Sequence, residues 1–265
     1  TDIKIIRPGY HDRPDQTFTD AFLAAVSPFS HLRYMDVQGT NNSNPFYGLD
    51  YPDNVTLWED RITLDSPSQT AGDPSTNNVH VAWEYVIELA NATDTDAWIC
   101  IPVHATDEYV KKLAILFAYG VDMSGVDVSG SFDLEDGVKT TEPLKDTLRI
   151  YTEHSNEVWN FGFQQYIYNK LAAIDEAEQG FDWGSSDEEQ QARRRHLKRG
   201  RDIGQIFKEV FAPLTGEDTL FEKIRPVHAH RSAALSSGFN GNWKEPVDWM
   251  ESTYGPVSDY FYGFA

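Results

Sequence analysis

Short apolar runs alternate along this chain with segments in which apolar residues recur at helical spacing. Runs of this kind, bounded by turn-forming residues, are typical of buried β-strands. We predict strands at residues 3–6, 32–37, 97–103, 148–152, 224–228 and 260–264. Strand followed by helix, repeated along a chain, is typical of a parallel sheet whose strands are joined by crossover helices. The pattern therefore predicts an α/β protein.

One connecting segment carries a clear helix signal. Val110, Leu113 and Phe117 lie on one helical face, and Thr106 or Asp107 is placed to cap the helix. A helix here would bury its apolar face against the predicted sheet.

A second, longer helix is predicted to begin with a capping box formed by Ser186 and Glu189. Its apolar stripe consists of Ile203, Ile206, Phe207, Val210 and Phe211. Residues 65–76 and 122–137 are rich in Gly, Ser and Asp, which predicts loops. The strand–helix alternation resumes after each loop, so we expect a single domain over residues 1–265.

Composition narrows the choice of partners. The chain has 265 residues, 40% of them hydrophobic, which is enough for one large domain with a core. Its net charge of −20 argues against nucleic acid and anionic membranes, because both are polyanions. Cys100 is the only cysteine, so no intramolecular disulfide can form. We find neither a signal peptide nor an apolar run long enough to insert in a membrane.

Two further features bear on location and charge. Glycosylation sequons at Asn41, Asn54 and Asn91, with the acidity, favour a secreted or extracellular glycoprotein, although such triplets matter only in a eukaryotic secretory pathway. Residues 193–201 form a basic run after acidic residues 187–189 on the same predicted helix. We interpret this run as pairing from i to i+4 on a solvated helix face.

Polar residues follow several of the predicted strands. The carboxyl ends of parallel strands meet at one edge of a sheet, where the active sites of barrel enzymes are found. We therefore expect the functional site to draw on Asp36, His104, Asn156, Glu157, His228, His230, Tyr260 and Tyr262.

The pair Asn156-Glu157 is the most informative of these. A carboxylate at a strand end with an amide beside it suits a proton donor to a sugar, with Trp159 available to stack on a sugar ring. Alternatively, Asn156 caps the following helix and Glu157 lies in its first turn. In the same way, Arg33 could be a buried ion-pair partner and His104 a hydrogen-bonded core histidine.

A metal site is a third alternative. His228 and His230 alternate on one strand, so both side chains would face the same side. A zinc ion would need a further ligand, for which His104 or Asp36 is available. The spacing alone is not specific for a metal.

The motif Ser-Asn-Glu-Val-Trp-Asn at residues 155–160, with Leu-Arg-Tyr-Met-Asp at 32–36 and Ile-Pro-Val-His at 101–104, resembles glycoside hydrolase clan A and secreted glycosidase-like proteins of that type. The resemblance covers nearly the whole chain and implies a (β/α)8 TIM barrel without a cofactor. It implies that Glu157 is the acid/base, that Asn156 grips a sugar 2-hydroxyl and that Arg33 keeps the nucleophile ionised. It also implies subsite roles for His104, His228 and Tyr262.

The chain departs from that family at the nucleophile. Clan members carry it as a second glutamate after strand seven, whereas Ala265 follows the sixth predicted strand, and the late residues Glu245 and Glu251 precede that strand. We therefore expect an incomplete barrel of about six strands, as a piece of a longer polypeptide or with other subunits.

Two functions remain open: a retaining β-glycosidase acting on a β-linked polysaccharide or oligosaccharide, and an inactive extracellular carbohydrate-binding or structural glycoprotein. The net charge disfavours a sulfated polymer unless the basic run at residues 193–201 lies near the cleft.

Overall fold

The computed structural model describes residues 6–40, 55–70, 80–216, 219–230 and 241–265. At its centre is a parallel sheet of five strands in the order β1-β2-β5-β6-β7. The strands are β1 (His31–Tyr34), β2 (Asp96–Ile101), β5 (Ile150–His154), β6 (Ile224–His228) and β7 (Gly263–Phe264). Strands that are neighbours in the sheet also follow one another in the chain, so every crossover advances in the same direction. Crossovers of one hand then place their helices on one face of the sheet.

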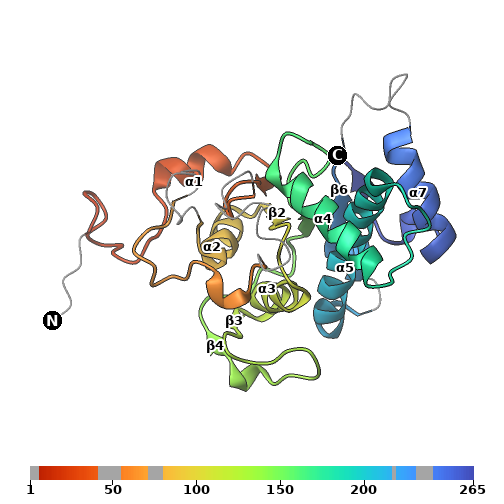
Figure 1. Ribbon diagram of the computed structural model, residues 1–265. Helices are drawn as coiled ribbons and strands as arrows, with labels where there is room; N and C mark the ends of the chain where they lie inside the picture. Colours follow the sequence, from red (N-terminus) through yellow and green to blue (C-terminus); the bar gives the residue numbers. More distant parts are fainter. Residues whose placement is uncertain (1–5, 41–54, 71–79, 217–218, 231–240) are drawn as a thin grey trace.

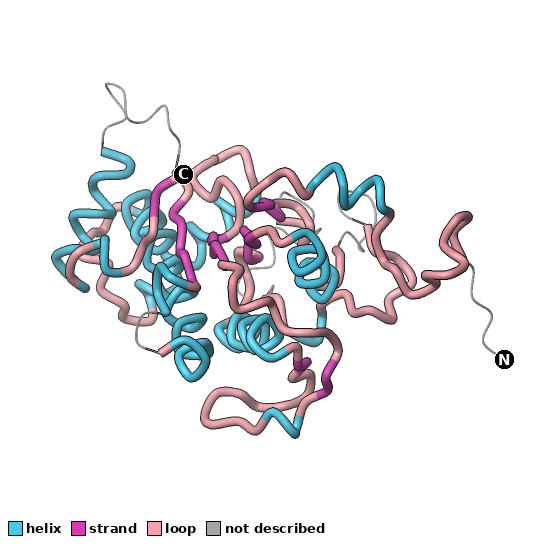
Figure 2. Tube along the Cα trace, turned by 180° about the vertical axis from the view of Figure 1, so that it is seen from behind, coloured by secondary structure: helices cyan, strands magenta, loops and turns pink. Residues whose placement is uncertain are grey.

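One helix precedes the first strand, and the other helices fill the connections between the strands (Figure 1). They are α1 (Asp20–Val26), α2 (Trp83–Thr93), α3 (Asp107–Tyr119), α4 (Gln164–Glu178), α5 (Glu188–Thr215), α6 (Thr219–Glu222) and α7 (Gly241–Tyr254). A small antiparallel pair, β3 (Val121–Asp122) and β4 (Val138–Lys139), projects from the β2–β5 connection. Single 3-10 turns lie at Trp58–Asp60, Leu134–Asp136 and Val257–Asp259. Seen from behind in Figure 2, the described N-terminal segment extends away from the sheet and its helices.

The apolar core lies between one face of the sheet and helices α2, α3 and α5. Alternate residues of β2, among them Ile99 and Ile101, are fully buried and belong to this core. The helices contribute large side chains that include Trp83, Phe117 and Phe207, all fully buried. Successive residues of a strand point to opposite faces, so the remaining β2 residues point away from this core.

The opposite face of the sheet carries aromatic and cationic side chains. In the strand register, Arg33 is the partner of Trp98, Trp98 of Tyr151, and Tyr151 of Arg225. Registered partners share a face, and the rings of Trp98 and Tyr151 stack with centroids 5.8 Å apart. Arg225 donates from Nη1 to the Tyr151 hydroxyl at 2.6 Å. A row of polar and aromatic groups thus crosses four strands.

The prediction of an α/β protein with a parallel sheet is confirmed. The strand bounds differ by a few residues, since β2 ends just before Pro102 and β5 continues to His154. The run at 260–264 is mostly irregular, because the turn Val257–Asp259 precedes it and only Gly263–Phe264 pairs with β6. The predicted strand at 3–6 lies mostly outside the described residues. Among those residues β1 pairs only with β2 and β7 only with β6, so the sheet is open and a closed barrel stays a prediction.

Both predicted helices form, α3 and α5, but the predicted N-terminal cap is correct only for α3. Thr106 caps α3, and its hydroxyl accepts from the Tyr109 backbone N–H. The capping box predicted at Ser186 does not form. Instead Asp187 is the N-cap of α5, because its carboxylate accepts from the backbone N–H groups of both Glu189 and Gln190. Where described, the two predicted loops are largely irregular, although the strands β3 and β4 lie at the two ends of the second loop.

The described residues include one predicted sequon, Asn91 on α2, whereas Asn41 and Asn54 lie outside them. The Asn91 side chain donates from Nδ2 to the Pro143 carbonyl at 2.9 Å and accepts the Lys145 backbone N–H at 2.9 Å. It therefore joins α2 to the segment that leads into β5. No helix in the described ranges is both long and apolar enough to cross a membrane.

We expect Asn91 to remain unglycosylated, because its amide is engaged on both sides. Asn91→Ala should cost about 1–3 kcal/mol of unfolding free energy by stripping two backbone groups of partners. Asn91→Asp keeps the acceptor for Lys145 and should cost less. Urea unfolding measures both losses, and peptide mass after eukaryotic secretion measures occupancy. A stoichiometric glycan on Asn91, or an unchanged midpoint for Asn91→Ala, would contradict this expectation.

Candidate functional site

A buried carboxylate, Glu153 on β5, forms the centre of a polar network on the aromatic face of the sheet. Its side chain is fully buried, and Arg33 donates to both oxygens, from Nε at 3.0 Å and from Nη2 at 2.8 Å. Trp98 Nε1 donates to Oε2 at 2.7 Å, and the Cys100 thiol lies 3.4 Å from the same oxygen. The register explains the cluster, because Cys100 is the strand partner of Glu153 and Trp98 that of Arg33.

Arg33 also holds Asn156, one of the residues predicted for the site, in place. Its Nη2 donates to Asn156 Oδ1 at 2.8 Å, and Gln165 on α4 donates to the Asn156 backbone carbonyl at 2.7 Å. Asn156 is buried as a result. We call Arg33, Trp98, Cys100, Glu153 and Asn156 the Arg33 network.

The backbone beside Asn156 adopts an unusual conformation. Ser155 has φ of 59° and Glu157 has φ of 45°, in the left-handed region that residues other than glycine rarely occupy. Such strain persists only where the surroundings enforce it, and it gathers at functional sites. The Glu157 side chain is half-buried, and its Oε2 accepts from Asn160 Nδ2 at 2.9 Å.

These contacts and helix bounds decide between two of the alternatives that the sequence left open. The capping interpretation of Asn156 is wrong, because α4 begins only at Gln164 and its N-cap is Phe163. The ion-pair interpretation of Arg33 is confirmed, and its partner is Glu153. Sequence analysis did not single out Glu153. The signal was a carboxylate in the middle of a strand, at the position that alternates with Tyr151.

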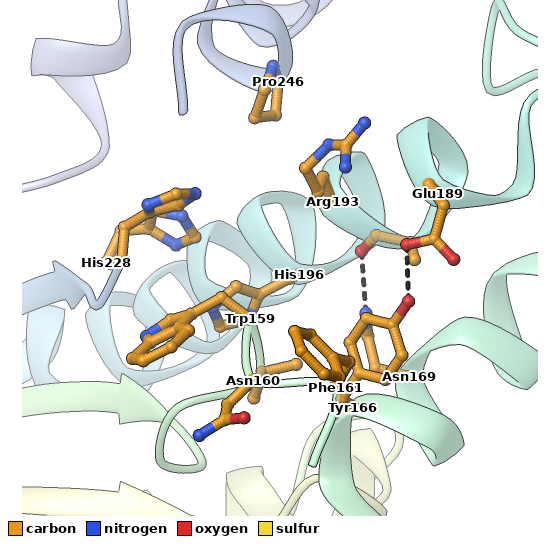
Figure 3. Close-up of a pocket in the computed structure, with 13 residues that line it drawn as sticks. Trp159, Asn160, Phe161, Tyr166, Asn169, Glu189, Arg193, His196, His228 and Pro246 are labelled. Atoms are coloured by element: carbon orange, nitrogen blue, oxygen red, sulfur yellow. Dashed lines mark hydrogen bonds between the residues drawn. The ribbon is translucent and has the colours of Figure 1, made fainter. Parts of the chain in front are cut away.

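A cavity of about 420 Å³ lies beside Glu157. Trp159, Asn160 and Phe161 of the β5–α4 loop line one side, and Figure 3 shows residues of α5 and α7 across from them. His228, at the end of β6, lines it as well. We call this space the Trp159 cavity. Glu157 itself does not line the cavity, but Asn160 does and also donates to Glu157, so one residue connects the cavity with the carboxylate.

Buried histidines form one end of the Trp159 cavity. His154 and His196 face each other through their Nδ1 atoms at 3.0 Å, and the rings of His196 and His228 lie 4.5 Å apart. Burial lowers the pKa of His196 to about 3 and holds the pKa values of His154 and His228 well below the usual range. All three are therefore neutral near pH 7.

The described residues do not support the predicted metal alternative. His228 and His230 are near each other, with ring centroids 6.2 Å apart. Within the described part of the chain, however, no three side chains of His, Cys, Asp or Glu converge to hold a metal ion. His104, the proposed third ligand, lines a different cavity, beside Tyr168 and Arg195.

His104 has the surroundings expected of a core histidine. Its Nδ1 is hydrogen-bonded to the Thr56 hydroxyl at 2.8 Å, and its ring packs edge-on against Tyr168. Burial, with a smaller effect from His80, lowers its pKa to about 4.

Tyr262 also lies outside the Trp159 cavity. Its ring contacts Tyr151 edge-on and lies under the guanidinium of Arg225, on the aromatic face of the sheet. Of the residues predicted for the site, the structure thus joins Arg33 and Asn156 by a hydrogen bond, while Glu157 follows Asn156 in the chain and is bonded to Asn160. The structure joins Trp159 and His228 in the adjoining cavity.

The pairing predicted for the basic run at residues 193–201, from i to i+4 along the helix, is wrong for most of its residues. Lys198 pairs with Asp202 at i+4 and Arg201 with the same carboxylate at i+1. The other pairs reach neighbouring elements, because α5 packs against α3, α4 and α7. The acidic residues at the start of α5 pair with Lys170 of α4 rather than with the run. The pairs across elements are Arg194–Glu245, Arg195–Glu176 and Arg199–Asp107.

Comparison with known proteins finds no relative. No family model matches the chain, and no curated protein or solved structure matches it significantly.

Proposed function

We propose that this chain is a glycoside hydrolase-like protein that takes a β-linked polysaccharide at the carboxyl edge of its sheet, with Glu157 as the acid/base. The observation that carries this proposal is the double role of Arg33, which binds the buried Glu153 and also fixes Asn156. Asn156 is thereby positioned toward a sugar hydroxyl. Glu157 follows it at the edge, half-buried beside a cavity lined with aromatic rings.

The chemistry follows from a carboxyl group in that place. Protonated Glu157 donates its proton to the leaving glycosidic oxygen, and its carboxylate then activates the water that enters. A retaining mechanism also needs a carboxylate nucleophile about 5–5.5 Å away. Glu153 does not serve, because it is fully buried and both its oxygens are bonded.

We infer that the nucleophile is supplied by further strands of a (β/α)8 barrel. Five parallel strands that follow chain order are the arrangement of part of such a barrel. The open edges at β1 and β7 are where more strands would pair. A secreted protein of this kind would meet polysaccharide outside the cell.

Glu157→Gln tests the catalytic role. Turnover of aryl β-glycosides with poor leaving groups should fall about 10²- to 10⁴-fold, because the proton donor is lost. A substrate with a good leaving group, which needs no proton, should lose much less in the glycosylation step. Glu178→Gln, an exposed site on α4, is the matched control and should leave turnover unchanged. Equal turnover of Glu157→Gln and wild type on every substrate would remove Glu157 from the mechanism.

The second candidate is a carbohydrate-binding protein without catalysis. It is favoured by the contacts of Glu157, which among the described residues include the amide of Asn160 but no second carboxylate. Calorimetric binding of β-linked oligosaccharides without turnover by the wild type would establish this second function.

A further inference from the structure

We propose that the Trp159 cavity is a subsite for an acidic sugar unit, whose carboxylate or sulfate group is bound by Arg193. This inference rests on the proposed function and names its substrate class. It is carried by one cation that differs from its neighbours and by the aromatic side chains beside it.

Arg193 is the exception in the basic run of α5. The neighbouring cations all contact carboxylates, in the pairs Arg194–Glu245, Arg195–Glu176, Lys198–Asp202, Arg199–Asp107 and Arg201–Asp202. Arg193 forms no hydrogen bond or ion pair with any described residue, and its Nε is shielded from solvent without a partner. A buried N–H without an acceptor is unfavourable, and a bound anion would remove that cost. Because the chain as a whole has a net charge of −20, an unpaired arginine offers an anion a specific binding group.

Among the lining residues, Glu189 is a charged neighbour of Arg193, and the Arg193 charge helps to lower the pKa of its carboxyl without forming an ion pair with it. Glu189 faces the same space, but Lys170 donates to its Oε1 at 2.6 Å and the Tyr166 hydroxyl donates to its Oε2. Both carboxylate oxygens are thus engaged within the protein. His196 and His228 are neutral, because burial holds their pKa values low. Arg193 therefore supplies the cationic group that a ligand would meet.

Aromatic side chains make the cavity suitable for a sugar ring. Trp159 is half-buried in its wall, and Phe161 is 77% exposed at its mouth. Figure 3 shows both rings on the loop opposite the α5 residues that include Arg193. A flat aromatic surface on one side and a guanidinium on the other match a pyranose that carries an anionic substituent. The volume of about 420 Å³ lies in the range of small-ligand sites.

A residue that lines the cavity also contacts the proposed acid/base, Glu157. Asn160 lines the cavity and donates to Glu157 Oε2 at 2.9 Å. A sugar held by Trp159 and Arg193 would therefore lie next to the glycosidic oxygen that Glu157 protonates. The protein would recognise the acidic sugar unit in the subsite next to the glycosidic bond that is cleaved.

Calorimetry with three tetrasaccharides tests this proposal: one of β-linked uronic acids, one of sulfated β-linked sugars and one of neutral β-linked glucose. Wild type should bind one acidic probe about 10- to 100-fold more tightly than the neutral one, as expected for a charge-assisted contact. The tighter of the two acidic probes identifies carboxylate or sulfate as the group recognised. This preference should weaken as salt is raised.

Arg193→Gln should remove the preference for the acidic probe and leave neutral binding unchanged. Arg193→Lys keeps the charge without the planar fork, so it should retain part of the preference and serves as a second variant if the first folds poorly. Lys208→Gln, which removes the same charge elsewhere on α5, is the matched control. Circular dichroism checks the fold of each.

Two results would overturn the inference. If wild type binds neutral and acidic probes equally, or if Arg193→Gln binds acidic probes as tightly as wild type, the acidic subsite is wrong and the proposed function is untouched. If no tetrasaccharide of any class binds, the proposed function fails with it.

Discussion

Between pH 7 and pH 5 the protein is expected to lose several kcal/mol of folding free energy through four buried histidines. Burial lowers the pKa of His104 to about 4 and of His196 to about 3, and it holds those of His154 and His228 well below 6.5. In the unfolded chain the same side chains titrate near pH 6.5. Below that pH the unfolded state therefore binds more protons than the folded state, and stability falls.

The size of the effect follows from the pKa difference. His104 and His196 each lose about 1.4 kcal/mol per pH unit below 6.5, so at pH 5 each costs about 2 kcal/mol, and His154 and His228 act in the same direction. The loss is thus a large part of the stability of an ordinary domain, about 5–15 kcal/mol. The loss continues until the pH reaches the folded-state pKa values. Carboxylates with lowered pKa values, such as Glu59 and Glu189, add their effect only at lower pH.

The geometry at the cavity explains why the folded state resists protonation. Two Nδ1 atoms that face each other at 3.0 Å share one hydrogen, so a second proton would place two N–H groups in opposition. His196 already uses its other nitrogen toward the Ala229 carbonyl at 3.3 Å. The charged side chains that act on this pair include Arg195 and Arg199, whose positive charge further disfavours a second proton.

Urea unfolding at pH 7, 6 and 5 measures this prediction, because the slope of stability against pH counts the protons taken up. His104→Gln should lower the slope by about one proton, since it removes one of the four groups. His11→Gln, at an exposed site, should not change it. A stability that stays flat from pH 7 to pH 5 would contradict the burial of these histidines.

The sheet could be predicted from the sequence because its signals are local. Apolar runs of strand length mark the strands whatever they later contact, and one-handed crossovers determine how such strands are placed. The strand-end position of Asn156 and Glu157 followed from the same reasoning. The sequence does not show which way a side chain at the end of a strand points. His104 therefore lines a different cavity from His228, although both follow strands.

The partner of Arg33 could not be predicted in this way. Glu153 lies 120 residues away, and the two meet only through the register of β1, β2 and β5. One sequence does not give that register. The capping interpretation of Asn156 failed for a related reason, because the left-handed turns at Ser155 and Glu157 are imposed by surrounding contacts.

The second large effect is expected when that long-range pair is broken. Arg33→Met leaves the Glu153 carboxylate fully buried, and its remaining partners among the described residues are Trp98 and the Cys100 thiol. Removing one member of a buried ion pair costs about 3–5 kcal/mol, because a charge remains without compensation. Although the Arg33 side chain is 32% exposed, the cost arises at Glu153, which has no access to water. Urea unfolding at pH 7 measures the loss.

A double variant separates this loss from simple loss of packing. Arg33→Met with Glu153→Gln removes both charges, so it should recover much of the stability that Arg33→Met loses. Arg13→Met is the matched control, since it breaks an exposed pair with Asp20 that water screens and that contributes little to stability. If Arg33→Met costs no more than Arg13→Met, Glu153 does not depend on Arg33. If the double variant is stable but binds no sugar, the role of Arg33 is to hold Asn156 in place for the ligand.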